Sequence, residues 1–77
     1  MWWLEAFDKK TELLVKDYAL PFAPDDPFLA KVLKRDPDKL LGGGFALDAD
    51  QLHQLAAHIP EPLTPDLYDY QIEYLRD

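Results

Sequence analysis

Tyr68-Asp69-Tyr70-Gln71-Ile72-Glu73-Tyr74-Leu75 is the stretch that decides the fold. Large apolar and polar side chains alternate along it. Because successive side chains of a strand point to opposite faces, this period of two places the tyrosines and Ile72 on one face of a sheet. The other face then carries Asp69, Gln71 and Glu73. An antiparallel sheet can keep one face in water, so this strand predicts a sheet with an apolar face and an acidic face.

A β-hairpin is predicted at the start of the chain. The apolar run Trp2–Phe7 and the mixed run Leu13–Tyr18 are typical of strands, and Asp8–Thr11 between them forms a polar turn. No glycine in this turn fixes the pairing of the two strands, so the register stays open.

The register of this hairpin depends on which residues form its loop. With Lys9 and Lys10 as the loop, Glu5 is expected opposite Leu14, and Trp3 opposite Lys16.

Adjacent tryptophans at the first strand indicate two different environments. Trp2 and Trp3 must point to opposite faces, so one belongs to the core. The other is covered by another element or is exposed, and an exposed tryptophan on a sheet is a candidate contact for a partner. Depending on the register, Glu5, Glu12 and Asp17 extend the acidic face of the last strand.

The first of two predicted helices follows a proline-rich segment. Asp26-Pro27 is a typical helix start, because Asp accepts hydrogen bonds from free backbone N–H groups and Pro suits the first helical position. Apolar residues recur at helical spacing through Leu33, with Lys and Arg toward the end, where cations are favoured. Asp36-Pro37 is expected to end this helix.

The second helix is predicted to begin with a capping box. Asp48 is the N-cap residue and Gln51 reaches back to it. Apolar residues at helical spacing continue to Ile59, and Pro60 ends the pattern. A short strand is expected just before this helix, over residues 45–47.

These elements predict an α+β fold in the order β-β-α-β-α-β. We expect an antiparallel sheet of three to four strands with two short helices on one face. A chain of 77 residues allows a single domain, residues 1–77, with little volume for a deep substrate cavity.

Net charge narrows the class of partner. The chain carries 15 acids and 8 bases, a formal net charge of −7. Nucleic acid and anionic membrane surfaces are disfavoured, because both attract Lys and Arg. A basic protein partner is favoured, since opposite fields speed encounter. The plainer alternative is that the acidity serves solubility alone.

Acidity is also uneven along the chain. Residues 1–41 carry eight acids and seven bases, whereas residues 42–77 carry seven acids and one base. A partner-binding surface explains this asymmetry more naturally than solubility does.

Catalytic and metal-binding patterns are weak. The chain has no serine and no cysteine, so the two commonest nucleophiles and any zinc-thiolate site are missing. His53 and His58 lie five apart on one helix, which turns them roughly 140° from each other and away from a shared metal. We therefore expect no enzymatic activity, no metal and no cofactor.

The glycine run Gly42-Gly43-Gly44 precedes Phe45. No Lys-Ser or Lys-Thr pair follows it, so it does not fit a phosphate-binding loop. It is either a tight turn into the short strand or a thin backbone site that a partner can approach closely.

At several points the chain resembles the cloacin-type bacteriocin immunity proteins. Residues 3–12 are similar to that family's "WFDK-TE" opening, and Gly43-Gly44-Phe45 falls where the family has Gly-Cys-Phe. Residues 51–58 match a helical stretch with paired leucines, and residues 69–77 resemble an aromatic strand closing in "DYRDG".

This resemblance implies an antiparallel sheet with small helices and a tight complex with a cationic toxin domain that cleaves ribosomal RNA. Acidic and aromatic residues of the sheet would face the toxin, with Phe45, Asp69, Glu73 and Glu12 as the matching positions. Gly44 replaces the family's Cys, and residues 25–41 are more helical than the family's loop. A sister family that guards against another toxin is therefore also compatible.

We expect an immunity protein that binds a basic toxin domain, with a generic acidic adaptor for a non-toxin partner as the alternative. The candidate contacts come from the acidic strand, the hairpin and the glycine run: Asp69, Gln71, Glu73, Phe45, Gly44, Glu12, Glu5, Asp17 and Trp3. The start of the chain lacks a basic head and a long apolar run, so we expect no targeting segment and a cytoplasmic protein. The oligomeric state stays open.

Overall fold

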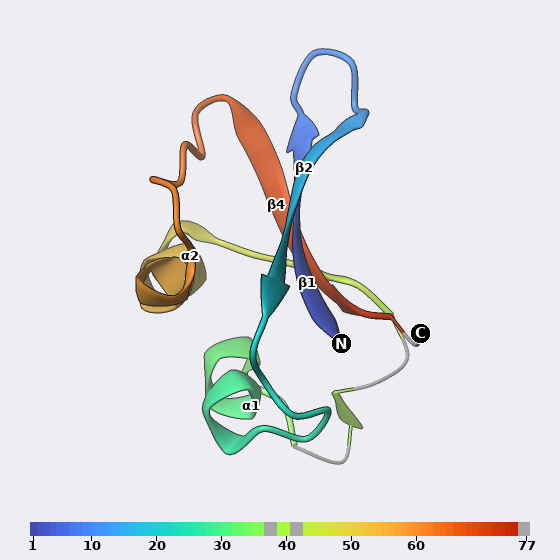
Figure 1. The fold of residues 1–77 in the computed structure, drawn as a ribbon, viewed down its shortest axis with the longest axis vertical. Helices are drawn as coiled ribbons and strands as arrows, with labels where there is room; N and C mark the ends of the chain where they lie inside the picture. Colours follow the sequence, from blue (N-terminus) through green and yellow to red (C-terminus); the bar gives the residue numbers. More distant parts are fainter. Residues whose placement is uncertain (37–38, 41–42, 76–77) are drawn as a thin grey trace.

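The computed structural model describes residues 1–36, 39–40 and 43–75. The elements follow the expected order β-β-α-β-α-β and form an α+β fold (Figure 1). Their bounds are β1 Trp2–Asp8, β2 Leu14–Leu20, α1 Pro27–Leu33, β3 Phe45–Ala46, α2 Ala49–Leu55, a 3-10 turn Ala56–His58, and β4 Tyr68–Tyr74. Pro37, Gly42 and the Arg76-Asp77 end of the last motif lie outside the described residues.

All four strands are antiparallel, in the spatial order β2-β1-β4-β3. The strand β1 is central, because it pairs with β2 from Trp2 to Phe7 and with β4 from Trp2 to Asp8. The two-residue β3 pairs with the middle of β4 only, through Phe45 opposite Ile72 and Ala46 opposite Gln71. Met1 and Leu75 lie side by side, since the Met1 ammonium donates a hydrogen bond to the Leu75 carbonyl at 2.7 Å.

The predicted hairpin is confirmed, and its register, which the sequence left open, is not the one that a Lys9-Lys10 loop would give. Glu5 lies opposite Asp17 and Trp3 opposite Ala19, not opposite Leu14 and Lys16. The cause is a longer turn. The Asp8 carboxylate accepts hydrogen bonds from two turn N–H groups, and the Asp8 N–H donates to the carbonyl of Leu13.

Two further irregularities complete this turn. Glu12 adopts a positive φ of 62°, which non-glycine residues rarely do. The pairing also shifts by one residue between Ala6 and Phe7, a β-bulge that moves β2 along β1.

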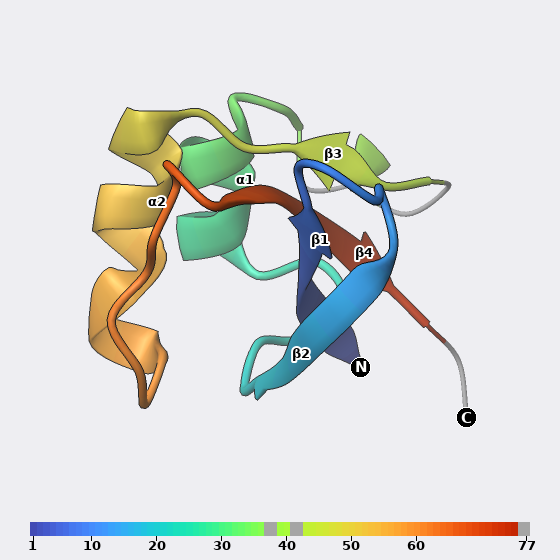
Figure 2. The same cartoon turned by 90° about the horizontal axis from the view of Figure 1, so that it is seen from above.

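Both helices lie on the same side of the sheet (Figure 2). The even-numbered residues of β1 (Trp2, Leu4 and Ala6) are fully buried beneath them. Apolar residues from β2, β4 and both helices complete one core, which includes Leu20, Leu29, Val32, Leu33, Leu40, Leu52, Leu55, Ile59, Tyr70 and Ile72. Trp2 is the largest of these side chains, and its indole N–H donates to the Ala23 carbonyl at 3.0 Å.

The helix starts were predicted correctly. The Asp26 carboxylate accepts from the backbone N–H of Phe28 and of Leu29, with Pro27 at the first helical position. Asp48 and Gln51 form the predicted capping box, with hydrogen bonds of 2.8 and 2.9 Å.

The first helix ends earlier than expected, at Leu33 rather than at Asp36-Pro37. The backbone of Lys34 turns into the left-handed region there, with φ 57° and ψ 44°. The Lys34 N–H returns to the Lys31 carbonyl, and the Arg35 N–H to the Ala30 carbonyl, which closes the helix in a Schellman-type cap. No helix in the described part of the chain has the length and apolar character that crossing a membrane requires.

Candidate partner-binding surface

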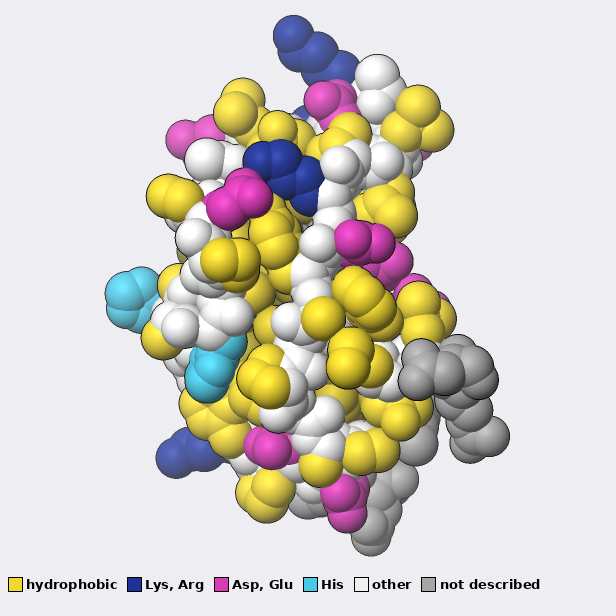
Figure 3. Space-filling view, in the orientation of Figure 1, with side chains coloured by type: hydrophobic (Ala, Val, Ile, Leu, Met, Phe, Trp, Pro, Cys, Tyr) yellow, Lys and Arg dark blue, Asp and Glu magenta, His cyan; other side chains and the backbone are white. Residues whose placement is uncertain are grey.

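The side of the sheet away from the helices is uncovered, and we call it the open face. It carries the odd-numbered residues of β1 and the residues that pair with them across the strands: Trp3, Glu5 and Phe7 of β1, Leu14, Asp17 and Ala19 of β2, Asp69, Gln71 and Glu73 of β4, and Ala46 of β3. Figure 3 shows acidic side chains on the side away from helix α2, with hydrophobic side chains above and below them. The paired residues form three rows across the strands: Trp3 with Ala19 and Glu73 in one outer row, Glu5 with Asp17 and Gln71 in the middle row, and Phe7 with Leu14 and Asp69 in the other outer row.

The middle row contains Glu5, the most buried charged side chain among residues 1–36, 39–40 and 43–75. Glu5 is only 9% exposed, yet it lies directly opposite Asp17 on β2. On its other side it accepts a hydrogen bond of 3.1 Å from the amide of Gln71. Like charges opposite each other on neighbouring strands are destabilising. The free domain therefore holds a repulsive acidic pair that a cation from a partner would relieve.

Glu73 joins this acidic group from the next row. Burial raises the pKa of Glu73 above its usual range, and hydrogen bonding to the Glu5 carboxyl and the Glu5 charge raise it further. Its cross-strand neighbour is Trp3, which is half-buried. A carboxylate with a raised pKa is poorly solvated when ionised, so Glu73 gains from a cationic partner as well.

Replacing Glu73 by Gln is expected to raise the stability of the free domain at pH 7 by a few tenths of a kcal/mol, the scale of one cross-strand like-charge contact. The folded-state pKa of Glu73 lies above the unfolded value of 4.5, so protonation favours the folded state. The Glu73 carboxyl therefore contributes stability to the wild type as the pH falls from neutral toward 4.5, and the variant lacks this contribution. Urea unfolding at pH 7 and pH 5 measures both effects.

Asp69→Asn is the matched control, because the Asp69 carboxylate on the same strand pairs with Lys9 at 3.4 Å and not with another acid. This control should show no gain at pH 7. A Glu73→Gln variant that is less stable than the wild type at pH 7, or whose advantage is as large at pH 5, would show that the two glutamates do not repel each other.

Apolar side chains flank the acids at both ends of the open face. Trp3 lies in one outer row and Phe7 in the other, each half-buried and two residues from Glu5 on the same strand. Leu14 pairs with Phe7 across the hairpin and is 47% exposed. Aromatic anchors beside desolvated charges are the side chains that dominate protein–protein binding energy.

The structure gathers six of the nine predicted contact residues on the open face: Trp3, Glu5, Asp17, Asp69, Gln71 and Glu73. Gly44 lies beside it, where a Cβ atom would come within 3.3 Å of the Gln71 amide nitrogen. Phe45 and Glu12 lie outside the open face, and a physical reason accounts for the position of each.

Phe45 points to the helix side of the sheet, because it pairs with Ile72, which is fully buried in the core. Its ring packs against that core, and the Arg35 guanidinium lies 4.8 Å from the ring centroid. Glu12 is exposed in the hairpin turn before the first residue of β2, so it does not extend the acidic face.

Phe7 and Leu14 are open-face residues that the sequence-based prediction missed. For Phe7 the signal was present, since the alternation that places Trp3 and Glu5 on one face also places Phe7 there. For Leu14 it was not, because the bulge between Ala6 and Phe7 determines which residue of β2 lies opposite Phe7.

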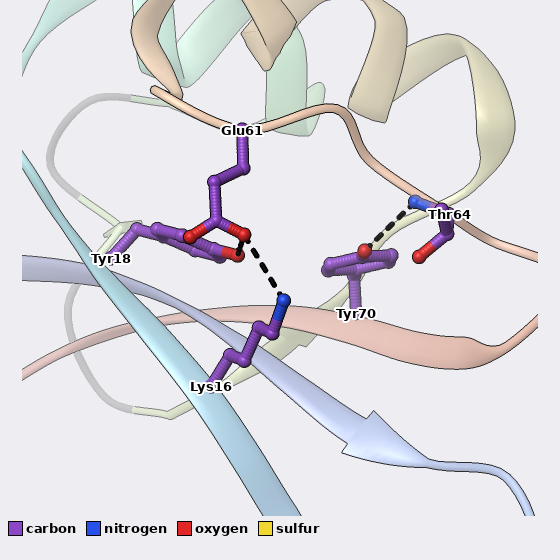
Figure 4. Close-up of polar contacts among 5 residues, drawn as sticks. All are labelled: Lys16, Tyr18, Glu61, Thr64 and Tyr70. Carbon is purple, nitrogen blue, oxygen red and sulfur yellow. Dashed lines mark hydrogen bonds and ion pairs between the residues drawn. The ribbon is translucent and has the colours of Figure 1, made fainter.

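On the helix side, the segment between the 3-10 turn and β4 is fastened to the sheet (Figure 4). The Glu61 carboxylate accepts from the Lys16 ammonium at 3.0 Å and from the Tyr18 hydroxyl at 3.2 Å. Hydrogen bonding and charge from Lys16 lower the pKa of Glu61. The Tyr70 hydroxyl accepts from the Thr64 N–H at 3.0 Å. These contacts hold the segment on the core side and leave the open face clear.

The histidines lie away from the open face. Both are exposed on the helix side, and the His58 ring packs against Phe22 with ring centroids 5.0 Å apart. Within residues 1–36, 39–40 and 43–75, no three His, Cys, Asp or Glu side chains are placed to hold a metal ion. The chemistry that the described residues bring together on the open face is ionic and apolar contact.

A family model described as a domain of unknown function (DUF7683) matches residues 1–73. The chain belongs to this family. The matched region contains every residue of the open face, from Trp3 to Glu73. No curated protein and no solved structure matches the chain.

Proposed function

We propose that this DUF7683 domain is an immunity protein, which binds and neutralises a basic bacterial toxin domain through its open face. The observation that carries the proposal is the placement of four acids beside two half-buried aromatic side chains, Trp3 and Phe7, on an uncovered sheet face: Glu5, Asp17, Asp69 and Glu73. Binding a cationic surface would relieve the repulsion of Glu5 with Asp17 and Glu73 while it buries Trp3 and Phe7.

The mechanism is steric cover with charge complementarity. A sheet surface with aromatic anchors and a charged middle row suits a partner surface of about 800 Å² per side, the standard size for a specific complex. The acidic field speeds association, and the anchored, desolvated contacts slow release. A bound toxin cannot reach its substrate while the domain covers its active site or a neighbouring surface. The resemblance to cloacin-type immunity proteins supports a ribonuclease as the toxin.

Co-expression with the product of the adjacent gene in the native host tests the proposal. We expect a one-to-one complex on size-exclusion chromatography at low salt, and growth of a bacterial host that the neighbouring protein alone would arrest. A complex that forms without relieving toxicity would reject the immunity function and favour an adaptor with a non-toxin partner. If a basic neighbouring protein is not bound even at 50 mM salt, the proposal fails.

A further inference from the structure

Beside the end of α1, on the helix side of the sheet, the domain has a second charged feature. A hollow of about 520 Å³ is lined by Ala30, Lys31, Lys34, Arg35, Asp36 and Lys39, and we call it the basic hollow. These six residues include four of the eight Lys and Arg residues in a chain of net charge −7. The one acid among them, Asp36, lies 3.9 Å from the Lys39 ammonium. The six lining residues therefore carry an excess of positive charge.

Helix capping does not account for these cations. Lys and Arg near a helix C-terminus commonly interact with the last carbonyl groups. Here the carbonyls of Ala30 and Lys31 already accept from the backbone N–H groups of Arg35 and Lys34, at 3.0 and 3.2 Å. Three of the four cations follow the last helical residue, so only Lys31 belongs to the helix itself.

Lys34 occupies a position that normally favours glycine. Its backbone is left-handed, with φ 57° and ψ 44°, at the residue that closes the helix. Glycine adopts this conformation without the steric conflict that a Cβ atom brings. A lysine at this position places a charge at the hollow although its backbone conformation is unfavourable for a residue with a Cβ atom. Residues in disfavoured backbone conformations often lie at binding sites.

Arg35 is held in place by a second contact. Its guanidinium lies over the Phe45 ring, 4.8 Å from the ring centroid, a cation–π contact that favours one orientation of its planar fork. An arginine presents paired donors to a phosphate, and lysines supply point charges around it.

We propose that the basic hollow binds the polyphosphate group of a small molecule. Its volume of about 520 Å³ is larger than a single phosphate needs. Four cations match an anion with several negative charges. A long nucleic acid is a poorer occupant, because the net charge of −7 repels an extended polyanion beyond the hollow.

Isothermal titration of the full chain with pyrophosphate tests this site. We expect binding that weakens as salt is raised, and weaker binding of inorganic phosphate, which spans fewer cations. Titration with adenosine triphosphate tests whether the site recognises a nucleotide or the phosphate groups alone. Tighter binding than pyrophosphate would indicate a nucleotide, and equal binding would indicate that the phosphates alone are recognised. Absence of pyrophosphate binding at low salt would overturn the proposal.

Lys34→Gly separates binding from folding. Glycine suits the backbone at this position, so the urea midpoint should stay unchanged or rise, while pyrophosphate affinity falls at least tenfold. Lys31→Gln combined with Lys39→Gln should lower affinity at least as much. The matched control is Lys9→Gln with Lys10→Gln in the hairpin turn, which removes the same charge and should leave affinity within twofold. Unchanged affinity in Lys34→Gly, or an equal loss in the control, would reject the site.

Discussion

Trp2→Ala is expected to remove most of the stability of the domain, whereas Trp3→Ala, one residue further along β1, should leave it folded. Trp2 is fully buried and is the largest side chain of the core. Truncating such a residue costs about 3–5 kcal/mol, because the transfer free energy is lost and a cavity remains. Small domains have total stabilities of about 5–15 kcal/mol, and a chain of 77 residues lies toward the lower end.

Two specific contacts add to the loss at Trp2. Its indole N–H donates to the Ala23 carbonyl at 3.0 Å, which fixes the segment between β2 and α1 against the sheet. Its ring also meets Tyr74 edge to face, with ring centroids 5.4 Å apart. Trp2→Phe keeps an aromatic ring but loses the hydrogen bond, so we expect an intermediate loss of about 1–2 kcal/mol.

Trp3→Ala is the control with the same change in chemistry. Its side chain is half-buried on the open face, and no helix lies over it, so its truncation should cost about 1 kcal/mol. Urea unfolding followed by far-ultraviolet circular dichroism compares the variants without using tryptophan fluorescence. Equal unfolding midpoints for Trp2→Ala and Trp3→Ala would contradict the assignment of the two faces.

The sequence predicted most of the architecture because its strongest patterns are local. The alternation along residues 68–75, the Asp26-Pro27 helix start and the capping box at Asp48 each depend on neighbours within a few residues, and all three are confirmed. The opposite orientations of Trp2 and Trp3 follow from the same strand periodicity.

The features that the sequence did not predict depend on backbone conformations that the residue types do not indicate. Glu12 and Lys34 take positive φ values without being glycine, so the sequence indicated neither the long hairpin turn nor the early end of α1. The hairpin register shifted with that turn, and Asp17 became the neighbour of Glu5. Pairing register is a long-range property, and each one-residue slip moves a side chain to the other face.

The distribution of charge in space also differs from its distribution along the chain. The sequence concentrates acidity in residues 42–77, yet Glu5 and Asp17 come from the first half. They join Glu73 because β1 lies in the middle of the sheet, between β2 and β4. The acids of the open face therefore come from both halves of the chain.

Reversing two charges of the open face is expected to abolish tight binding of the basic partner that we propose. The double variant Asp17→Lys with Glu73→Lys changes the charge of this surface by four units and leaves the buried Glu5 unsubstituted. Electrostatic steering raises association rates by about 10- to 1,000-fold, so we expect the association rate constant of this variant to decrease by a factor in that range. New lysines opposite a cationic surface also add repulsion in the complex, which should raise the dissociation rate.

A matched control separates the open face from the overall charge. Asp25→Lys with Asp66→Lys changes the net charge by the same amount at two exposed turn residues outside the open face. Surface plasmon resonance against the partner at 50 and 300 mM salt would measure both variants. If the open face is the binding surface, the Asp17 and Glu73 pair loses most of its affinity and its salt dependence, and the control keeps both within a few-fold. Equal losses would mean that net charge alone drives association, and the open face would then have no special role.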